Sequence, residues 1–190
     1  MKTALFAAAL TLAGTSATAG AVKYDLDPSH SQIIFSYDHI GFSTTYGMFS
    51  GFSGEIMFDE ADPAASSVSV SMPAQSMITG WEARLRHFMS SDFFDASSDE
   101  IVTFISTEIE VTGEDTAVIM GDLNLNGVTK PVTLDARLNK ADKHPMSNKE
   151  WLGFDATTKL KRSEYGLGAF APAISDEVNI KISLEAMISD

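Results

Sequence analysis

The 190-residue sequence contains no cysteine, so no disulfide can cross-link the chain and no thiolate can act as nucleophile or metal ligand. Bases are also scarce. The chain has 13 Lys and Arg against 26 Asp and Glu, and its net charge of −13 disfavours nucleic acids and anionic membrane surfaces as partners. Beyond the N-terminus, no apolar run approaches the length that spans a bilayer. The composition therefore excludes a disulfide scaffold and argues against a polyanion-binding protein.

The first nineteen residues have the layout of a secretory signal peptide. Lys2 supplies a short positive start, an apolar run covers Ala4–Ala13, and small residues occupy positions 17 and 19. The alternative, a membrane anchor, is disfavoured because the apolar run is too short to span a bilayer. We expect cleavage after Ala19 and a single soluble domain formed by residues 20–190. Secretion without disulfides favours the bacterial periplasm as the location.

Most of the chain alternates apolar and polar residues, which is typical of strands with one buried face. The clearest run is "EVNIKISLEAMI", and others are "SQIIFSYDHI", "FSGEIMFDE", "SSVSVSM", "IVTFISTEIEV" and "EWLGFDATTKL". Asn126 and Gly127 separate two such runs and predict a type I′ hairpin, because both residues tolerate positive φ. Pro131 in the strand that follows predicts an edge-like position or a bulge. We interpret three glycines as bulges or bends in a strongly curved strand: Gly47, Gly51 and Gly54.

One stretch has helical periodicity instead. Apolar residues recur at spacings of three and four, at Ile78, Trp81, Leu85, Phe88 and Met89. The pattern of the whole chain therefore predicts an all-β fold, an antiparallel barrel or sandwich of about eight strands with one helical segment.

An eight-stranded barrel has an interior that side chains just fill, or that holds one small ligand. The chain is long for a filled barrel, and its 12 Phe and 9 Met would form an adaptable apolar lining. However, most alternating apolar residues in proteins simply pack a core. Composition alone leaves both interpretations open.

Little in the sequence points to metal or catalytic chemistry. The four histidines, at positions 30, 39, 87 and 144, form no His-x-His or His-x-x-x-His pair, so we expect no metal site. No Gly-x-Ser-x-Gly nucleophile elbow occurs, and we expect no catalytic residue. We interpret His30 and His39 as residues that satisfy backbone groups near a turn and a rim.

Several motifs occur in a recognisable order. The opening "YDLDPSHSQIIFSYDHIGFSTTYGMFSGFSGEIMFD" combines Asp-x-x-His-Ser, Phe-x-x-x-His and Gly-x-Phe-x-x-Phe-x-Gly, and "SSDFFD", "GVTKPVTLDARL", "RSEYGLG" and "ISDEVNIKISLEA" follow it. Across residues 22–188 the chain resembles the YceI family of periplasmic, lipocalin-like polyisoprenoid-binding proteins. The resemblance implies an extended eight-stranded antiparallel barrel with a helical lid at one end. It also implies a long apolar tunnel for an isoprenoid or similar single-chain lipid, and frequent pairing as dimers.

The helical segment departs from the family, which usually has Arg-Asp-x-His-Leu where this chain has "RLRHF" at residues 84–88. On a helix of about 100° per residue, Arg84 and Arg86 flank the apolar face and His87 points nearly away from it. Two interpretations stand equal. Either the arginines hold a polar or phosphorylated lipid head at the barrel rim, or they pair with local acids such as Glu82 or Asp92 in water.

The sequence therefore predicts a periplasmic binding or carrier protein for a long-chain apolar lipid, such as a polyisoprenoid or isoprenoid quinone, with no other cofactor. Alternatives are a structural or stress-response envelope protein that acts through its surface or dimer face and, less favoured, an enzyme acting on a bound lipid. The expected partners are the lipid ligand, a second copy in a homodimer and, transiently, a membrane, but not nucleic acid. Candidate ligand contacts are Phe35, Tyr37, His39, Phe52, Trp81, Arg84, Arg86, Phe88, Met89, Phe93, Phe154 and Arg162.

Overall fold

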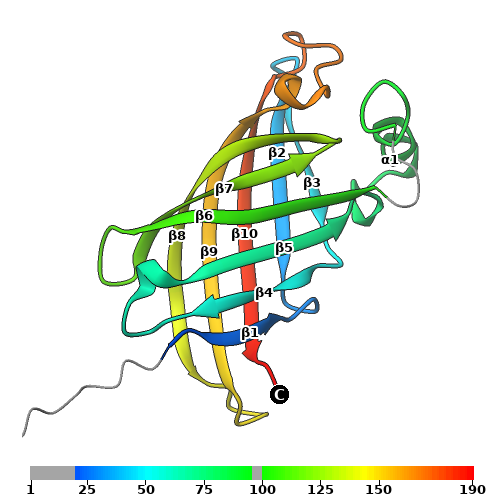
Figure 1. Ribbon diagram of the computed structural model, residues 1–190. Helices are drawn as coiled ribbons and strands as arrows, with labels where there is room; N and C mark the ends of the chain where they lie inside the picture. The colour runs from blue at the N-terminus through cyan, green and yellow to red at the C-terminus, as the bar shows by residue number, and fades with distance from the viewer. Residues whose placement is uncertain (1–19, 96–99) are drawn as a thin grey trace, which may run out of the picture.

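The computed structural model describes residues 20–95 and 100–190, so the predicted signal peptide lies outside the described residues. Ten strands form one antiparallel sheet that curves around a central space (Figure 1). The strands are β1 Val22–Leu26, β2 Gln32–His39, β3 Ser43–Phe49, β4 Ser53–Phe58, β5 Ser67–Pro73, β6 Ile101–Val111, β7 Thr116–Leu125, β8 Val128–Lys143, β9 Glu150–Lys161 and β10 Glu177–Ile188. The helices are α1 Glu82–Phe88 and three short 3₁₀ turns, η1 Pro63–Ala65, η2 Ala74–Ser76 and η3 Arg162–Tyr165.

The sheet closes because β1 pairs with both β4 and β10. The ring β1-β4-β5-β6-β7-β8-β9-β10 has eight strands, while β2 and β3 continue outward from β10. One edge of β10 pairs with two strands in turn. Its residues Asn179–Ser183 pair with β2, and Ala186–Ile188 pair with β1. Consequently β1 and β2 act as two halves of one interrupted strand, and β3 and β4 as halves of the next. The predicted eight-stranded antiparallel barrel is confirmed, with two of its strands broken.

Local chemistry explains both breaks. Between β1 and β2, the Asp27 carboxylate accepts hydrogen bonds from the backbone N–H (2.9 Å) and hydroxyl (2.7 Å) of Ser29, which folds the chain into a turn. Opposite this turn, the backbone oxygen of Glu185 accepts a hydrogen bond from the Asp27 N–H (2.8 Å). The Ser31 hydroxyl also bonds to the backbone oxygen and N–H of Glu185. Between β3 and β4, Gly51 has a φ of 68°, a bend that glycine adopts without steric cost.

The predicted hairpin and the predicted edge position are both confirmed. Asn126 and Gly127 have φ values of 54° and 71°, as a type I′ turn requires, and they join β7 to β8. Pro131 pairs only with Asp122 of β7, because the pairing of β8 with β9 begins at Asp135. The missing N–H of Pro131 therefore costs no ladder bond to β9.

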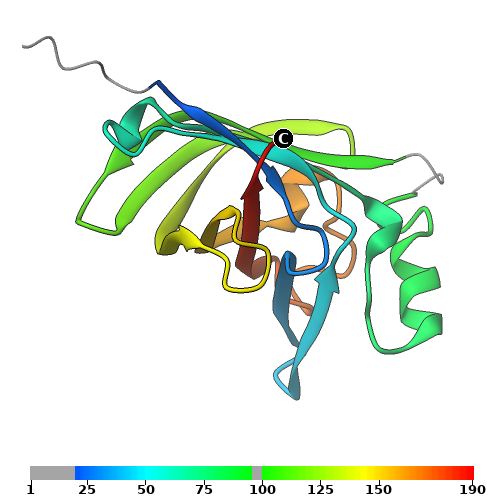
Figure 2. The ribbon, with the colours of Figure 1, turned by 90° about the horizontal axis from the view of Figure 1, so that it is seen from below.

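The helix is shorter than predicted. Ile78 exchanges two backbone hydrogen bonds with Met48 of β3 (2.7 and 2.9 Å), so this part of the predicted helix is strand-like. Gly80 then turns the chain with a φ of 72°, and α1 begins at Glu82. In Figure 2, α1 and the β2–β3 hairpin project from the same side of the sheet.

Buried side chains form two clusters in the barrel. One surrounds Phe35, Phe49 and Phe52, and the other surrounds Tyr24 and Leu152, where Leu152 is only 1% exposed. Within the described ranges, no helix has the length and apolarity that crossing a membrane would require.

Candidate ligand-binding site

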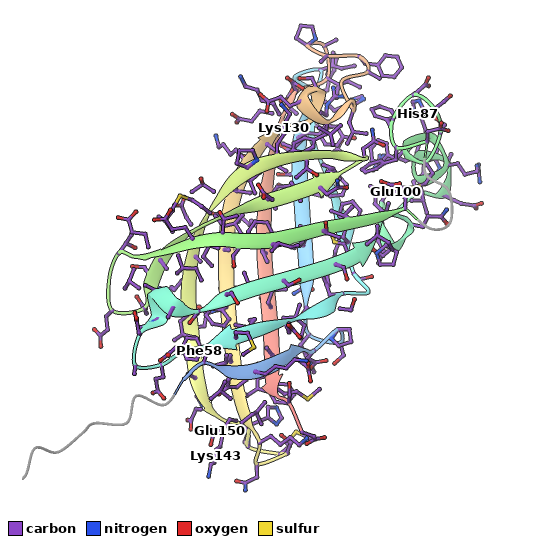
Figure 3. All side chains as sticks on the ribbon, viewed as in Figure 1. Phe58, His87, Glu100, Lys130, Lys143 and Glu150 are labelled. Carbon is purple, nitrogen blue, oxygen red and sulfur yellow. The ribbon has the colours of Figure 1, made fainter. Side chains whose placement is uncertain are left out.

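Two adjoining apolar cavities occupy the barrel. The larger has a volume of about 670 Å³ and lies beneath α1, β2 and the loop between β9 and β10 (residues 162–176, the β9–β10 loop). The smaller, of about 260 Å³, extends toward the opposite end. Figure 3 shows His87 at the α1 end and Phe58, which lines the smaller cavity, toward the other. Four side chains line both cavities and mark their junction: Phe49, Leu125, Leu160 and Ile180.

The larger cavity opens at what we call the α1 mouth, formed by β2, α1, the turn after α1 and the β9–β10 loop. Its charged or titratable lining residues are Tyr37, His39, Arg84, His87 and Arg162. None of the described residues that line it is a carboxylate. In an otherwise acidic protein, this mouth therefore favours an anionic or hydrogen-bond-accepting group.

Arg84 is held at this mouth by the lid segment itself. Its Nη1 donates to the backbone oxygen of Thr79 (3.1 Å), and its guanidinium lies 5.9 Å from the centre of the Trp81 ring. These contacts with described residues leave most of its five N–H donors uncommitted. Arg86 differs, because it pairs with Glu82 in solvent and lies outside the cavity lining. The structure thus separates the two arginines that the sequence analysis treated together.

Aromatic rings close part of the α1 mouth. The ring of Phe93 lies 5.3 Å from that of Phe88 and 6.1 Å from that of Phe170 on the β9–β10 loop. His87 lies beside both rings, 5.2 Å from Phe93 and 6.0 Å from Phe170, and its Nε2 lies 3.0 Å from the Asp92 Oδ2. Its side chain is 48% exposed, as expected for a residue nearly opposite the apolar face of the helix. It nevertheless lines the cavity at its rim, because the chain folds back after Phe88 and brings Phe93 close to it.

Arg162 organises the β9–β10 loop. Its Nε donates to Ser175 O, its Nη2 to Ile174 O and its Nη1 to Ala169 O, each at 2.9 Å, and Nη1 also donates to Leu167 O. Burial lowers its pKa, while the negative charge of nearby Asp176 acts in the opposite direction. Four of its five donors are thus used within the loop, which leaves at most one for a ligand.

The structure brings most of the predicted contacts together. Eight of them line the larger cavity: Phe35, Tyr37, His39, Trp81, Arg84, Phe88, Phe93 and Arg162. Phe154 lines the smaller cavity, while Phe52 and Met89 belong to the packed core and line neither. Their roles in binding a ligand stay predictions.

Ser29, His30 and Asp27 have the composition of a catalytic triad but not its geometry. The His30 Nδ1 atom contacts both the Ser29 Oγ (3.1 Å) and the Asp27 Oδ2 (2.6 Å). A triad needs the carboxylate and the hydroxyl on different ring nitrogens, so that one orients the base while the other is deprotonated. Here the three groups stabilise the turn between β1 and β2, where the His30 ring contacts side chains and not the backbone groups that were expected.

The same turn lies near Glu185, and the ligand atoms of Asp27, His30 and Glu185 are within 4.8 Å of one another. Asp27 already accepts hydrogen bonds from Ser29 and His30, and Glu185 accepts one from the Trp151 indole N–H (2.8 Å). Burial raises the pKa of Asp27, but the hydrogen bonds from His30 and Ser29 outweigh it and the net pKa is lowered. These carboxylates are therefore satisfied by the protein itself.

Comparison with known proteins agrees with this architecture. The YceI-like domain family matches residues 24–186. A UPF0312 protein of Ectopseudomonas mendocina is 38% identical over 98% of both chains, and the protein YceI of Escherichia coli is 37% identical over 95% of this chain and 93% of its own. The crystal structure of BcnA from Burkholderia cenocepacia superposes with a TM-score of 0.76 at 25% identity, covering 85% of this chain and 99% of that one. A polyisoprenoid-binding domain from Saccharophagus degradans superposes with a TM-score of 0.68 at 17% identity, covering 88% and 99%. The chain belongs to the YceI-like domain family.

Proposed function

We propose that the protein binds a single-chain apolar lipid, a polyisoprenoid or an isoprenoid quinone, inside the barrel and carries it across the bacterial periplasm. The observation that supports this best is the pair of adjoining apolar cavities, whose larger member has basic side chains and no described carboxylate in its lining, since Asp92, which contacts His87, lies outside that lining. The naming of a structural neighbour as a polyisoprenoid-binding domain is consistent with it.

Binding would be driven by the burial of the chain, at roughly 25 cal/mol per Å² of apolar surface. The head group would lie at the α1 mouth, near Arg84 and His87, while the chain fills the apolar interior. Selectivity between similar chains would be soft, because a hydrophobic pocket discriminates single methylenes weakly. Nothing in this arrangement requires the ligand to be chemically changed.

Mass spectrometry of an organic extract from natively purified periplasmic protein tests the proposal. We expect one single-chain lipid in near-stoichiometric amount. Ile180→Trp should displace it by filling the junction of the two cavities, whereas Asn179→Trp, on the exposed face of the same strand, should not. Wild-type protein that reproducibly yields no lipid, and binds none added in excess, would refute the carrier function.

Loading would occur by transient contact of the α1 mouth with a membrane. Large apolar side chains project around this mouth: Phe42 is 89% exposed, Trp81 64%, Phe170 54% and Ile40 51%. Phe170 and Trp81 also line the cavity, so a chain could pass from bilayer to barrel with little exposure to water. Dimerisation through this face would instead cover the mouth, so we place any homodimer contact elsewhere.

Transfer of a fluorescent prenyl lipid from neutral phosphatidylcholine vesicles measures this step. Phe42→Ser should slow transfer without changing the equilibrium affinity. Met146→Ser is the matched control, because Met146 is 91% exposed but lies in the turn between β8 and β9, away from the mouth. Equal transfer rates for the wild-type protein and both variants would exclude membrane contact through this surface.

A further inference from the structure

The smaller cavity reaches the protein surface at the end of the barrel opposite α1. Its lining includes exposed residues of two neighbouring connections, Pro63 of η1 and Gly113 and Glu114 of the β6–β7 hairpin. Arg137 of β8 and Asp155 of β9 complete this perimeter. We call this opening the hairpin mouth, and it gives the barrel a second entrance.

The lining between the two mouths is mostly apolar, although it includes Thr103 and Thr158. Phe49 stands at the junction of the cavities and packs against Phe35, with ring centres 5.6 Å apart. The tip of the Phe35 ring occupies the space where a side chain of Gly47 in β3 would begin, so the glycine leaves room for the ring against the barrel wall. Phe104 occupies the corresponding space over Gly121 in the smaller cavity. Each glycine lets a large ring lie against the wall instead of across the lumen.

The two mouths differ in charge. Among the residues that the structure describes, the hairpin mouth has three acids in its lining, Glu114, Asp115 and Asp155, and one base, Arg137. That base is already committed, because its Nη2 lies 2.8 Å from the Asp115 carboxylate and its Nε donates to the same oxygen. An anionic head is therefore repelled at the hairpin mouth and attracted at the α1 mouth, while an uncharged chain end meets no such barrier.

We propose that the barrel is a through-tunnel for linear chains longer than itself. The chain enters tail first at the α1 mouth, passes Phe49, and its uncharged end emerges at the hairpin mouth between η1 and the β6–β7 hairpin. This inference rests on the proposed lipid-binding function and specifies its ligand class as long, linear, prenyl-type chains. A through-tunnel imposes no upper limit on length, so affinity rises with chain length and then stays level once the end has emerged. A closed pocket instead rejects any chain that exceeds its depth.

A bulky substitution at the hairpin mouth distinguishes a through-tunnel from a closed pocket. Ala117 of β7 faces Ala136 of β8 across the ladder, and both small side chains line the smaller cavity. Ala117→Trp narrows the exit, whereas Val118→Trp places the same side chain at the next residue, which is outside the lining. The probes are a short prenyl alcohol, farnesol, and a long one, solanesol, whose dissociation constants are measured by quenching of tryptophan fluorescence.

Wild-type protein and Val118→Trp should bind solanesol at least as tightly as farnesol, and Ala117→Trp should lose at least about tenfold for solanesol only. Weak binding of solanesol by wild-type protein that binds farnesol well, or an Ala117→Trp variant that binds both alcohols normally, would overturn the through-tunnel and leave the carrier function intact. Failure of wild-type protein to bind either alcohol would instead refute the carrier function.

A second measurement uses only the wild-type protein, in case a tryptophan variant does not fold. Solanesol with a diazirine at the carbon farthest from its hydroxyl is bound, photolysed and mapped by peptide mass spectrometry. We expect adducts on residues 63–66 and 112–116. Adducts on residues 81–94 would mean that the chain folds back inside the barrel, and the through-tunnel would be wrong.

Discussion

The close contact between Phe35 and Gly47 makes a quantitative prediction about the width of the tunnel. A Cβ atom on residue 47 would lie 2.1 Å from Phe35 Cζ and 2.6 Å from Cε1. Carbon atoms pack comfortably at about 3.5 Å, so in Gly47→Ala the ring must move by roughly 1.5 Å, away from the wall and toward the lumen. Gly47 has no positive φ, so the backbone itself accepts alanine.

Overpacking of this kind lowers the unfolding free energy by about 1–3 kcal/mol. Alanine also reduces the conformational entropy of the unfolded chain relative to glycine, which raises the unfolding free energy by about 0.4–1 kcal/mol. We therefore expect Gly47→Ala to lose about 1–2 kcal/mol in unfolding free energy, measured by urea denaturation. It should also bind prenyl alcohols more weakly, because the displaced ring narrows the junction beside Phe49.

Gly153→Ala is the matched control. Gly153 also lies within a strand, and nothing comes within 4 Å of a Cβ placed there, so we expect a stability change of at most about 0.5 kcal/mol. Adding Phe35→Leu to Gly47→Ala should recover part of the lost stability and binding, with a coupling energy of about 1 kcal/mol or more. If Gly47→Ala is as stable as Gly153→Ala and binds prenyl alcohols normally, Gly47 does not determine the width of the tunnel and this reasoning fails.

Three further outcomes are expected. Leu152→Ala should cost about 2–5 kcal/mol in urea unfolding because its side chain is 1% exposed, and a loss below about 1 kcal/mol would contradict its place in the core. The hydrogen bond that His30 donates to the Asp27 carboxylate raises the pKa of His30 above its ordinary 6.5, so the stabilisation is fully present below pH 6.5 and lost as the pH rises through the folded pKa. Melting temperatures at about pH 6 and 8 should therefore differ more for wild-type protein than for His30→Gln, and identical differences would refute this role. Arg84→Ala should weaken binding of a prenyl phosphate about 10–100-fold and of the prenyl alcohol far less, with Arg86→Ala as the unaffected control; equal losses for both ligands would mean that Arg84 only stabilises the lid.

The features that followed from the sequence are those determined by neighbouring residues. The alternation of apolar and polar residues predicted the strands, because it depends only on the two-residue period of a strand. The β7–β8 hairpin followed from Asn126 and Gly127 because their backbone preferences are local. The edge position of Pro131 followed from the missing N–H of proline. The tunnel itself did not follow from composition, and only the resemblance to a family suggested it.

Most of the features that the sequence did not show depend on contacts between distant segments. The contact of His87 with Phe170 joins α1 to a loop that lies far along the chain. The predicted start of α1 is wrong because Ile78 pairs with Met48, and apolar spacing carries no information about that pairing. The different surroundings of Arg84 and Arg86 are local, since Arg84 donates to the Thr79 backbone and Arg86 pairs with Glu82, but the choice of partner depends on side-chain conformations that the sequence does not specify.

The division of β10 between β1 and β2 has a consequence for how the protein could specialise. The eight-stranded ring closes through β1 at one end of β10, while β2 pairs with the same edge of β10 over Asn179–Ser183 and carries β3 outward. Strands β2 and β3, α1 and the β9–β10 loop build the α1 mouth, where exposed side chains such as Phe42 contribute little to the buried core. Substitutions there should therefore alter head-group preference and transfer rate at small cost in stability, whereas substitutions at Leu152 or Ala186 alter the ring itself. Stability is thus determined by the buried side chains of the sheet, Phe35 and Phe49 of β2 and β3 included, and ligand choice by the exposed side chains at the α1 mouth.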